Sequence, residues 1–165
     1  MAREFIVDSG YVPGSIGRIS ELHGTYYHDH WRFGVYFEAK VATELSEFLT
    51  RFDEKKDGIW LATVNKRIEG SIVIDGIHAW DKGAHLRWFI MSDVLRGKGA
   101  GRELLDTAIN FCKIKGYKMI YLWTFEGLNA ARHLYEDAGF RLIKQQSGLQ
   151  WGTEVNEQYF ELWYS

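Results

Sequence analysis

Three glycines, Gly97, Gly99 and Gly101, stand within five residues, directly before a segment with helical spacing of its apolar residues. Glycine is a poor residue for opening a helix unless the backbone takes a positive φ angle or must approach another group closely. The start of a helix also leaves backbone N–H groups unpaired and carries the positive end of the helix dipole. This combination predicts a loop that binds an anion such as a phosphate.

Two common phosphate-binding motifs do not fit this loop. The P-loop motif GxxxxGK[ST] needs Ser or Thr after its lysine, and Lys98 is followed by Gly99. The dinucleotide motif GxGxxG has a longer spacing than the GxGxG present here, and it belongs to repeated βαβ units that the chain lacks. A third pattern, [Q/R]xxGx[G/A] between a strand and a helix, is matched by RGKGAG over 96–101.

The segments around the loop alternate between helical and strand spacing. Apolar residues predict helices that begin after Pro13, cover 36–52, and run from the glycines to Gly116. Strand-like runs separated by the turn-like segments NKR and WDKG predict an antiparallel meander. The predicted strands cover 4–8, 58–65, 67–79, 83–91, 118–125, 140–148 and 153–164, and a further short helix covers 128–140. We therefore predict one α/β domain over 1–165, with the element order β-α-α-β-β-β-α-β-α-β-β.

Composition excludes several classes of protein. The chain has 165 residues, a net charge of −2 and scattered Lys and Arg residues, which argues against a nucleic-acid partner. The single cysteine, Cys112, excludes an intrachain disulfide framework and a cysteine-rich metal site, and we expect a buried thiol. No apolar run approaches the roughly 20 residues of a membrane span, and Arg3 and Glu4 interrupt any signal peptide. We expect a soluble, cytoplasmic protein with no membrane partner.

Two motifs resemble the GNAT superfamily of N-acetyltransferases, and the resemblance covers nearly the whole chain. The segment FIMSDVLRGKGAGRELL resembles that family's fourth strand and acetyl-CoA loop. The segment LWTFEGLNAARHLYEDAGF resembles its fifth strand and following helix, with Asn129, Tyr135, Gly139 and Phe140 in the family pattern NxxxxxYxxxGF. The resemblance implies a mixed, mostly antiparallel central sheet flanked by helices.

A narrower resemblance covers the N-terminal helical region. The segments GYVPGSIGRISELHGTYYHDHW and FEAKVATELSEFL resemble the acetyltransferase half of fusions with winged-helix regulators of the MarR type. The sequence contains no winged helix, so we expect a free-standing enzyme half.

The superfamily resemblance implies a site for acetyl-CoA as a co-substrate, without a metal. The residues that it places against the cofactor are Phe89, Ile90, Met91, Arg96, Gly97, Lys98, Gly99, Ala100, Gly101, Asn129 and Tyr135. The first three would end a strand that splays from its neighbour and offers backbone groups to the pantetheine arm. The six residues 96–101 would bind the pyrophosphate. Asn129 would contact the cofactor or only cap its helix, and Lys98 and Arg102 would meet the 3′-phosphate or lie in solvent.

Tyr135 is the residue that the resemblance places at the thioester sulfur. An amine that attacks a thioester expels a thiolate, whose conjugate acid has a pKa of roughly 8.5. A phenol with a pKa of about 10 can donate a hydrogen bond to that sulfur and protonate it. We expect transfer to a primary amine by direct attack in a ternary complex, with the carbonyl polarised by a strand N–H near Met91. A route through Cys112 is disfavoured because this residue lies about three turns into its helix.

The identity of the general base that deprotonates the amine stays open. His85 alternates with Arg87, Phe89 and Met91, so we expect it to share a face with them. The other candidates are Glu126, Glu21, Glu38, His28, Asp29, His30 and a chain of water molecules. The spacing of HGTYYHDH lacks the HExxH pattern, and we predict no metal site there.

Aromatic residues crowd the expected acceptor side: Tyr26, Tyr27, Trp31, Phe33, Tyr36 and Phe37. They favour a small, partly apolar amine over a flexible basic protein tail. Alternatively, they pack on the sheet or bury a homodimer contact. The rival function is a non-catalytic acyl-CoA-binding sensor or interaction domain that works with a transcriptional regulator. A nucleotide-binding domain is a third interpretation, and the glycine spacing disfavours it.

Overall fold

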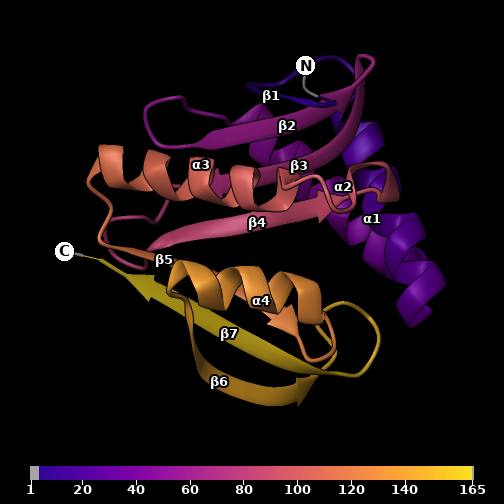
Figure 1. The fold of residues 1–165 in the computed structure, drawn as a ribbon. Helices are drawn as coiled ribbons and strands as arrows, with labels where there is room; N and C mark the ends of the chain where they lie inside the picture. The colour runs from indigo at the N-terminus through magenta and orange to yellow at the C-terminus, as the bar shows by residue number, and fades with distance from the viewer. Residues whose placement is uncertain (1–3, 165) are drawn as a thin grey trace.

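The computed structural model describes residues 4–164 as a single α/β domain around a seven-stranded sheet (Figure 1). Residues 1–3 and 165 of the predicted domain lie outside the described residues. The elements are β1 Ile6–Ser9, α1 Ser15–Trp31, α2 Val35–Thr50, β2 Gly58–Val64, β3 Arg67–Asp75, β4 Ala84–Met91, η1 Asp93–Leu95, α3 Ala100–Lys115, β5 Met119–Phe125, α4 Asn129–Ala138, β6 Arg141–Gly148 and β7 Val155–Trp163. The predicted order is confirmed, and η1 adds a single turn of 3-10 helix after β4.

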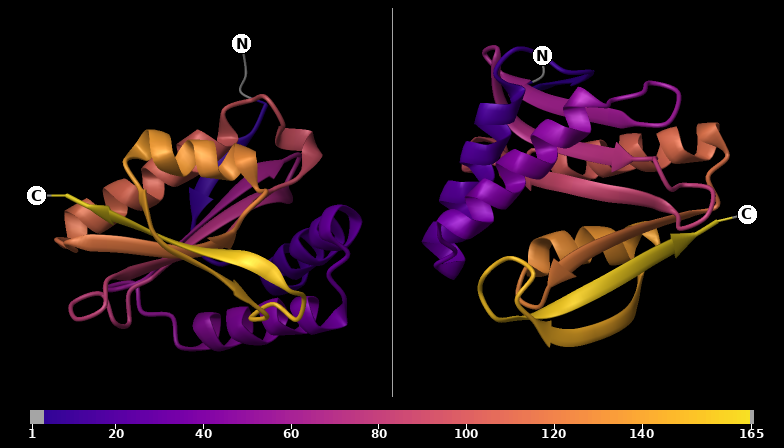
Figure 2. Two further views of the ribbon diagram at one scale, coloured as in Figure 1. Left: turned by 90° about the horizontal axis from the view of Figure 1, so that it is seen from below. Right: turned by 180° about the vertical axis from the view of Figure 1, so that it is seen from behind.

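The strands lie in the order β1-β2-β3-β4-β5-β7-β6, and every neighbouring pair is antiparallel except β4 with β5. Helices α3 and α4 lie on one face of the sheet, and α1 and α2 lie on the other (Figure 2). The mixed, mostly antiparallel sheet flanked by helices is therefore confirmed. Within residues 4–164, no helix combines the length and the apolar character needed to cross a bilayer.

Helix α3 illustrates how local sequence sets the buried face and the end of an element. Leu104, Leu105, Ala108 and Cys112 recur at helical spacing and are at most 1% exposed. Gly116 ends the helix with a φ of 80°, in the left-handed conformation that glycine adopts without strain. Burial raises the pKa of the Cys112 thiol to about 12, and the predicted buried thiol is confirmed.

The sheet opens between β4 and β5. These two parallel strands pair only at Ala84 with Ile120 and at His85 with Tyr121. Beyond these residues the strands diverge, as the widening gap between their ribbons shows (Figure 1). The far end of β4 therefore keeps its pairing with β3 on one edge, while its other edge has no strand partner.

A β-bulge in β4 changes which side chains share a face. The register against β3 shifts so that Val73 pairs with Arg87 and Ser71 pairs with Ile90, which leaves two residues of β4 opposite one of β3. Trp88 takes a φ of 46°, and its carbonyl accepts a hydrogen bond from the Ser71 hydroxyl at 2.7 Å.

The bulge makes the prediction for His85 wrong with respect to Phe89 and Met91, and right with respect to Arg87. Phe89 packs on the core beneath α3 and α4, whereas Arg87 forms an ion pair with Glu44 of α2 on the opposite face. Because side chains alternate up to Arg87, His85 shares the face of Arg87 and not that of Phe89 and Met91. A strict two-residue period cannot reveal a bulge, because the extra residue shifts the alternation.

Candidate active site

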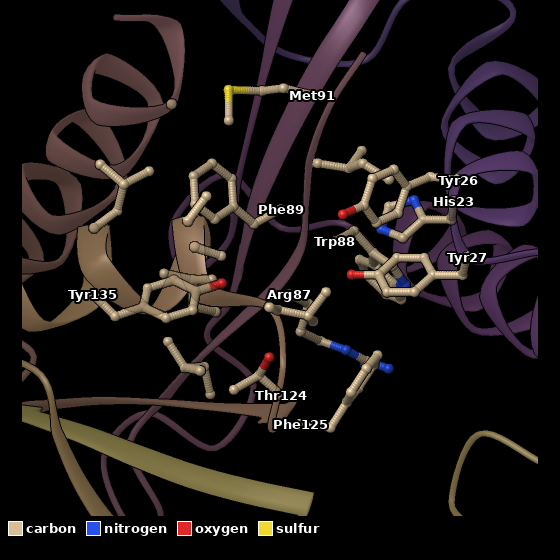
Figure 3. Close-up of a pocket in the computed structure, with 18 of the residues that line it drawn as sticks. His23, Tyr26, Tyr27, Arg87, Trp88, Phe89, Met91, Thr124, Phe125 and Tyr135 are labelled. Atoms are coloured by element: carbon tan, nitrogen blue, oxygen red, sulfur yellow. The ribbon is translucent and has the colours of Figure 1, made fainter. Parts of the chain in front are cut away.

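A cleft of about 1100 Å³ lies where β4 and β5 separate, and it reaches both faces of the sheet. We call one wall the loop side: the end of β4, residues 92–102 and helix α4. We call the other wall the aromatic side: His23, Tyr26 and Tyr27 of α1, Phe37 of α2, and Trp88. Figure 3 shows the two walls facing each other, with Tyr135 on one and Tyr27 on the other.

The loop side contains a helix start with free N–H groups. The first hydrogen bond of α3 runs from the N–H of Glu103 to the carbonyl of Gly99 at 3.1 Å. The N–H groups of residues 100–102 therefore have no partner in the helix. Gly97 and Gly99 have φ angles of 73° and 79°, and a Cβ on either would meet no atom within 4 Å. The turn thus presents unpaired donors to open space, as an anion site requires.

Gly101 is glycine for a different reason. A Cβ there would lie 2.6 Å from Cε of Met91 and 3.1 Å from Cδ1 of Leu134. The missing side chain lets α3 pack closely against β4 and α4. Only two of the three glycines therefore shape the open turn.

Of the three cationic residues in the loop, two line the cleft and one does not. Arg96 and Arg102 line the cleft and form exposed ion pairs with Asp93 at 2.5 Å and with Asp137 at 2.8 Å. Lys98 is not a lining residue, and its ammonium lies 3.1 Å from the carboxylate of Glu4. Ala100, Gly97, Gly99 and Gly101 do line the cleft.

The end of β4 presents backbone groups to the cleft. Phe89, Ile90 and Met91 all line it. The N–H of Ser92 donates to the carbonyl of Glu69 at 2.7 Å, on the β3 edge. Because successive residues of a strand direct their backbone groups to opposite edges, the N–H of Met91 is directed to the unpaired edge.

Tyr135 brings one hydroxyl into the cleft. Its ring is buried, with 6% exposure, and lies 6.0 Å from the ring of Phe89 and 5.8 Å from that of Phe140. Figure 3 shows its hydroxyl directed across the cleft toward that of Tyr27. Among residues 4–164 the hydroxyl has no hydrogen-bond partner. It is not fully buried, so part of its surface remains accessible. Burial, with a smaller contribution from Tyr27, raises the pKa of Tyr135, so the phenol stays protonated.

Asn129 lines the cleft as the first residue of α4. Of the two alternatives for Asn129, the helix cap is wrong: the N-cap is Leu128, and no side chain caps this end. The side-chain amide of Asn129 is therefore not committed to the helix.

The aromatic side depends on α1. His23, Tyr26 and Tyr27 stand three and four residues apart, so they occupy one face of the helix. The ring of Tyr27 lies 5.0 Å from that of Phe37 and 5.0 Å from that of Tyr26. Sequence reasoning placed the tyrosines here but missed His23, which it considered only as a metal ligand.

A charged cluster lies at the floor of the aromatic side. Lys40 pairs with the Glu44 carboxylate at 2.6 Å, and Arg87 forms a short ion pair with the other oxygen of this carboxylate. Arg87 also stacks over Trp88, with its guanidinium carbon 4.1 Å from the ring centroid. Sequence reasoning did not identify this cluster, because Glu44 and Arg87 lie 43 residues apart.

The candidates for a general base are mostly outside the cleft. His85 lines it, but its ring stacks on Tyr121 at 4.5 Å, and burial together with Arg87 lowers its pKa to about 3. The Glu126 carboxylate accepts a hydrogen bond from Asn156 at 2.6 Å, and Glu21 pairs with Arg18 at 2.6 Å. The predicted candidates that do not line the cleft are Glu21, His28, Asp29, His30, Glu38 and Glu126. No group of three His, Cys, Asp or Glu residues in the described part of the chain could hold a metal ion.

Comparisons with known proteins agree with this architecture. The chain matches the model of the acetyltransferase (GNAT) family over residues 19–140. A comparison with curated proteins gave no match. An acetyltransferase from Streptococcus agalactiae 2603 is similar in structure, with a TM-score of 0.75, 18% identity, and coverage of 99% of this chain and 100% of that one.

Two other solved structures contain a coenzyme. The yncA protein of Salmonella typhimurium, with its cofactor acetyl-CoA, has a TM-score of 0.75 at 14% identity, and the match covers 99% of this chain and 95% of that one. A chain of the NatC complex bound to Gag peptide and CoA has a TM-score of 0.75 at 18% identity, with coverage of 98% and 99%. At these identities the likeness concerns the fold. The family match spans more than half of the sequence, and the chain therefore belongs to the acetyltransferase (GNAT) family.

Proposed function

We propose that this protein transfers the acetyl group of acetyl-CoA to the primary amine of a small molecule, by direct attack within a ternary complex. The observation that carries the proposal is the Tyr135 hydroxyl, which has no partner in the described chain and opens into the same cleft as the helix start and the free edge of β4. These three features supply a proton donor, an anion site and a strand edge at one place.

The residues present fit acetyl-CoA. The N–H groups at the start of α3 and the guanidinium of Arg96 would hold the pyrophosphate, because both favour negative charge. The free edge of β4 would pair with the amide groups of the pantetheine arm. When bound, acetyl-CoA supplies a thioester carbonyl and a sulfur leaving group. Two of the similar structures are described with acetyl-CoA or CoA bound, and this supports acetyl-CoA as the ligand of the present protein.

The protein's own groups then have defined tasks. Tyr135 would donate a hydrogen bond at the sulfur, and its raised pKa keeps this proton in place at neutral pH. The N–H of Met91 would polarise the thioester carbonyl, since it is directed to the open edge. Much of the rate would come from positioning the amine beside the thioester.

The test is calorimetric titration with acetyl-CoA, with ATP and NAD on the same preparation as controls. We expect selective binding of acetyl-CoA, followed by thiol release when amines are added. Equal or tighter binding of ATP or NAD would contradict the proposal. Binding without turnover of any amine would favour the rival proposal of an acyl-CoA sensor that works with a regulator. That rival rests on the resemblance of residues 10–31 and 37–49 to MarR-type fusions.

A further inference from the structure

His23 places one unpartnered nitrogen in the cleft. The residue is 5% exposed, and its Nδ1 lies 2.8 Å from the carbonyl of Ile19 one turn earlier in α1. A carbonyl can only accept a hydrogen bond, so Nδ1 carries the proton, and Nε2 is left as an acceptor. No described residue donates a hydrogen bond to Nε2. This atom is not fully buried, so part of its surface remains accessible. The lone pair of Nε2 is therefore open to the cleft that His23 lines.

Tyr27 brings a hydroxyl to the same cleft, one turn further along α1. Its ring stacks on that of His23, with centroids 6.2 Å apart and planes at 15°. Its hydroxyl has no hydrogen-bond partner among residues 4–164 and is directed toward Tyr135 (Figure 3). A bound group that donates hydrogen bonds would satisfy both atoms. An amino group is such a donor.

Apart from the Tyr26 hydroxyl, the rest of the aromatic side is apolar or already paired. Tyr26, Phe37 and Trp88 line the cleft, and the Arg87 guanidinium covers one face of the Trp88 ring. The carboxylates that line it are Glu44 and Asp93, and each is already bound to Lys, Arg or both. No carboxylate among the described residues that line the cleft therefore remains for a second ammonium group of a polyamine. The cations beside Glu44 are likewise committed, which disfavours a carboxylate-bearing acceptor.

We propose that His23 and Tyr27 bind the amino group of the acceptor, and that the acceptor is a primary monoamine with a flat apolar skeleton. The inference rests on the proposed function and names its substrate class. In this arrangement the amine donates one N–H to Nε2 of His23. Its ammonium form, which dominates in solution near neutral pH, would be attracted by the ring of Tyr26 on entry, and the proton that it must lose before attack would pass to solvent. Burial lowers the pKa of His23 to about 4, so its ring stays neutral and accepting at the pH where amines are acetylated.

The substrate class is tested by steady-state thiol release with 2-phenylethylamine, phenylalanine, spermidine and a short peptide with a free N-terminus. We expect kcat/KM for 2-phenylethylamine to exceed the other three by about tenfold or more, since the other three bring charges or polar groups that the cleft leaves unpaired. A higher value for spermidine, phenylalanine or the peptide would overturn the substrate class.

The role of His23 is tested by a matched pair of variants. His23→Phe keeps a ring but removes the acceptor, and we expect KM for 2-phenylethylamine to rise about tenfold. His23→Gln places an amide oxygen near the position of Nε2, and we expect it to restore most of this loss. Tyr27→Phe removes only the hydroxyl and should raise KM about fivefold. Unchanged KM in His23→Phe, or equal KM in the Phe and Gln variants, would overturn the assignment.

Calorimetric binding of acetyl-CoA separates this inference from the proposed function. Each variant should bind acetyl-CoA as the natural protein does, which also reports that it is folded. If the natural protein does not bind acetyl-CoA, the proposed function fails and the inference fails with it. If binding and turnover are normal and the variants change neither KM nor substrate order, the inference alone fails.

Discussion

The two walls of the cleft offer different kinds of group. The loop side presents backbone N–H groups, at the start of α3 and along the free edge of β4. The aromatic side presents side-chain tips, Nε2 of the buried His23 and the hydroxyl of the half-buried Tyr27, held by rings from two helices. A wall made of backbone should be sensitive to changes in main-chain conformation. A wall made of side-chain tips should be sensitive to the loss of single atoms.

Tyr135→Phe should have the largest effect, because its hydroxyl is directed across the cleft from the loop side toward the aromatic side. We expect kcat to fall on the order of 10²-fold, the usual contribution of a positioned proton donor. The dissociation constant of acetyl-CoA should change less than about threefold, since the ring and its contacts with Phe89 and Phe140 remain. Thiol-release kinetics and calorimetry measure the two effects. Tyr164→Phe removes a buried hydroxyl outside the cleft and serves as the control. Unaltered turnover in Tyr135→Phe would mean another proton donor, or none.

Gly99→Val tests the backbone wall. A side chain at Gly99 would occupy the open space before the helix start, so we expect acetyl-CoA binding to weaken at least about tenfold. The matched control is Gly116→Val at the other end of the same helix, since the two φ angles are 79° and 80°. Both variants should lose about 2 kcal/mol of stability from left-handed strain, as measured by urea unfolding. Equal acetyl-CoA affinity in the two variants would remove the glycine turn from the site.

Acidification should destabilise the aromatic side. Burial lowers the pKa of His23 to about 4, and burial with Arg87 lowers that of His85 to about 3, from the ordinary 6.5. Below pH 6.5 the unfolded chain then binds more protons than the folded one, so the free energy of unfolding falls as the pH drops toward 4. Each histidine contributes up to about 1.4 kcal/mol per pH unit. Urea unfolding at several pH values measures the slope, which His23→Gln and His85→Gln should each reduce. A slope that neither variant changes would refute this account.

Lys98→Ala should have the smallest effect. Lys98 does not line the cleft and pairs with Glu4 at the surface, so only a screened charge is lost. We expect acetyl-CoA affinity to fall less than about threefold by calorimetry. A loss above tenfold would show that the lysine leaves Glu4 and contacts the bound cofactor.

The parts of this molecule that depend on local spacing could be predicted from the sequence. The order of elements follows from apolar periodicity. The turn before α3 follows from Gly97 and Gly99, because a positive φ angle favours glycine and is therefore visible in the sequence. The role of Gly101 could not be predicted, because it depends on how closely Met91 and Leu134 approach. The prediction that His85 lies on the same sheet face as Phe89 and Met91 was wrong, because the bulge at Trp88 is set by the register of β4 against β3.

The aromatic side depends on contacts between distant segments. Arg87 meets Glu44 from 43 residues away, and no local pattern links them. His23 stood at helical spacing from Tyr26 and Tyr27, a signal that could have placed it on their face. What the spacing could not show is that this face lines the cleft.

The buried thiol of Cys112 makes this protein convenient to assay. The thiolate is the form that reacts with disulfide reagents, and a thiol with no exposed surface and a pKa of about 12 is almost unreactive. A colorimetric reagent for thiols would therefore report free coenzyme A against a nearly blank protein background, because the chain has no other cysteine. The same reagent modifies Cys112 whenever the core beneath α3 opens, so its slow labelling rate measures how often the native structure opens there.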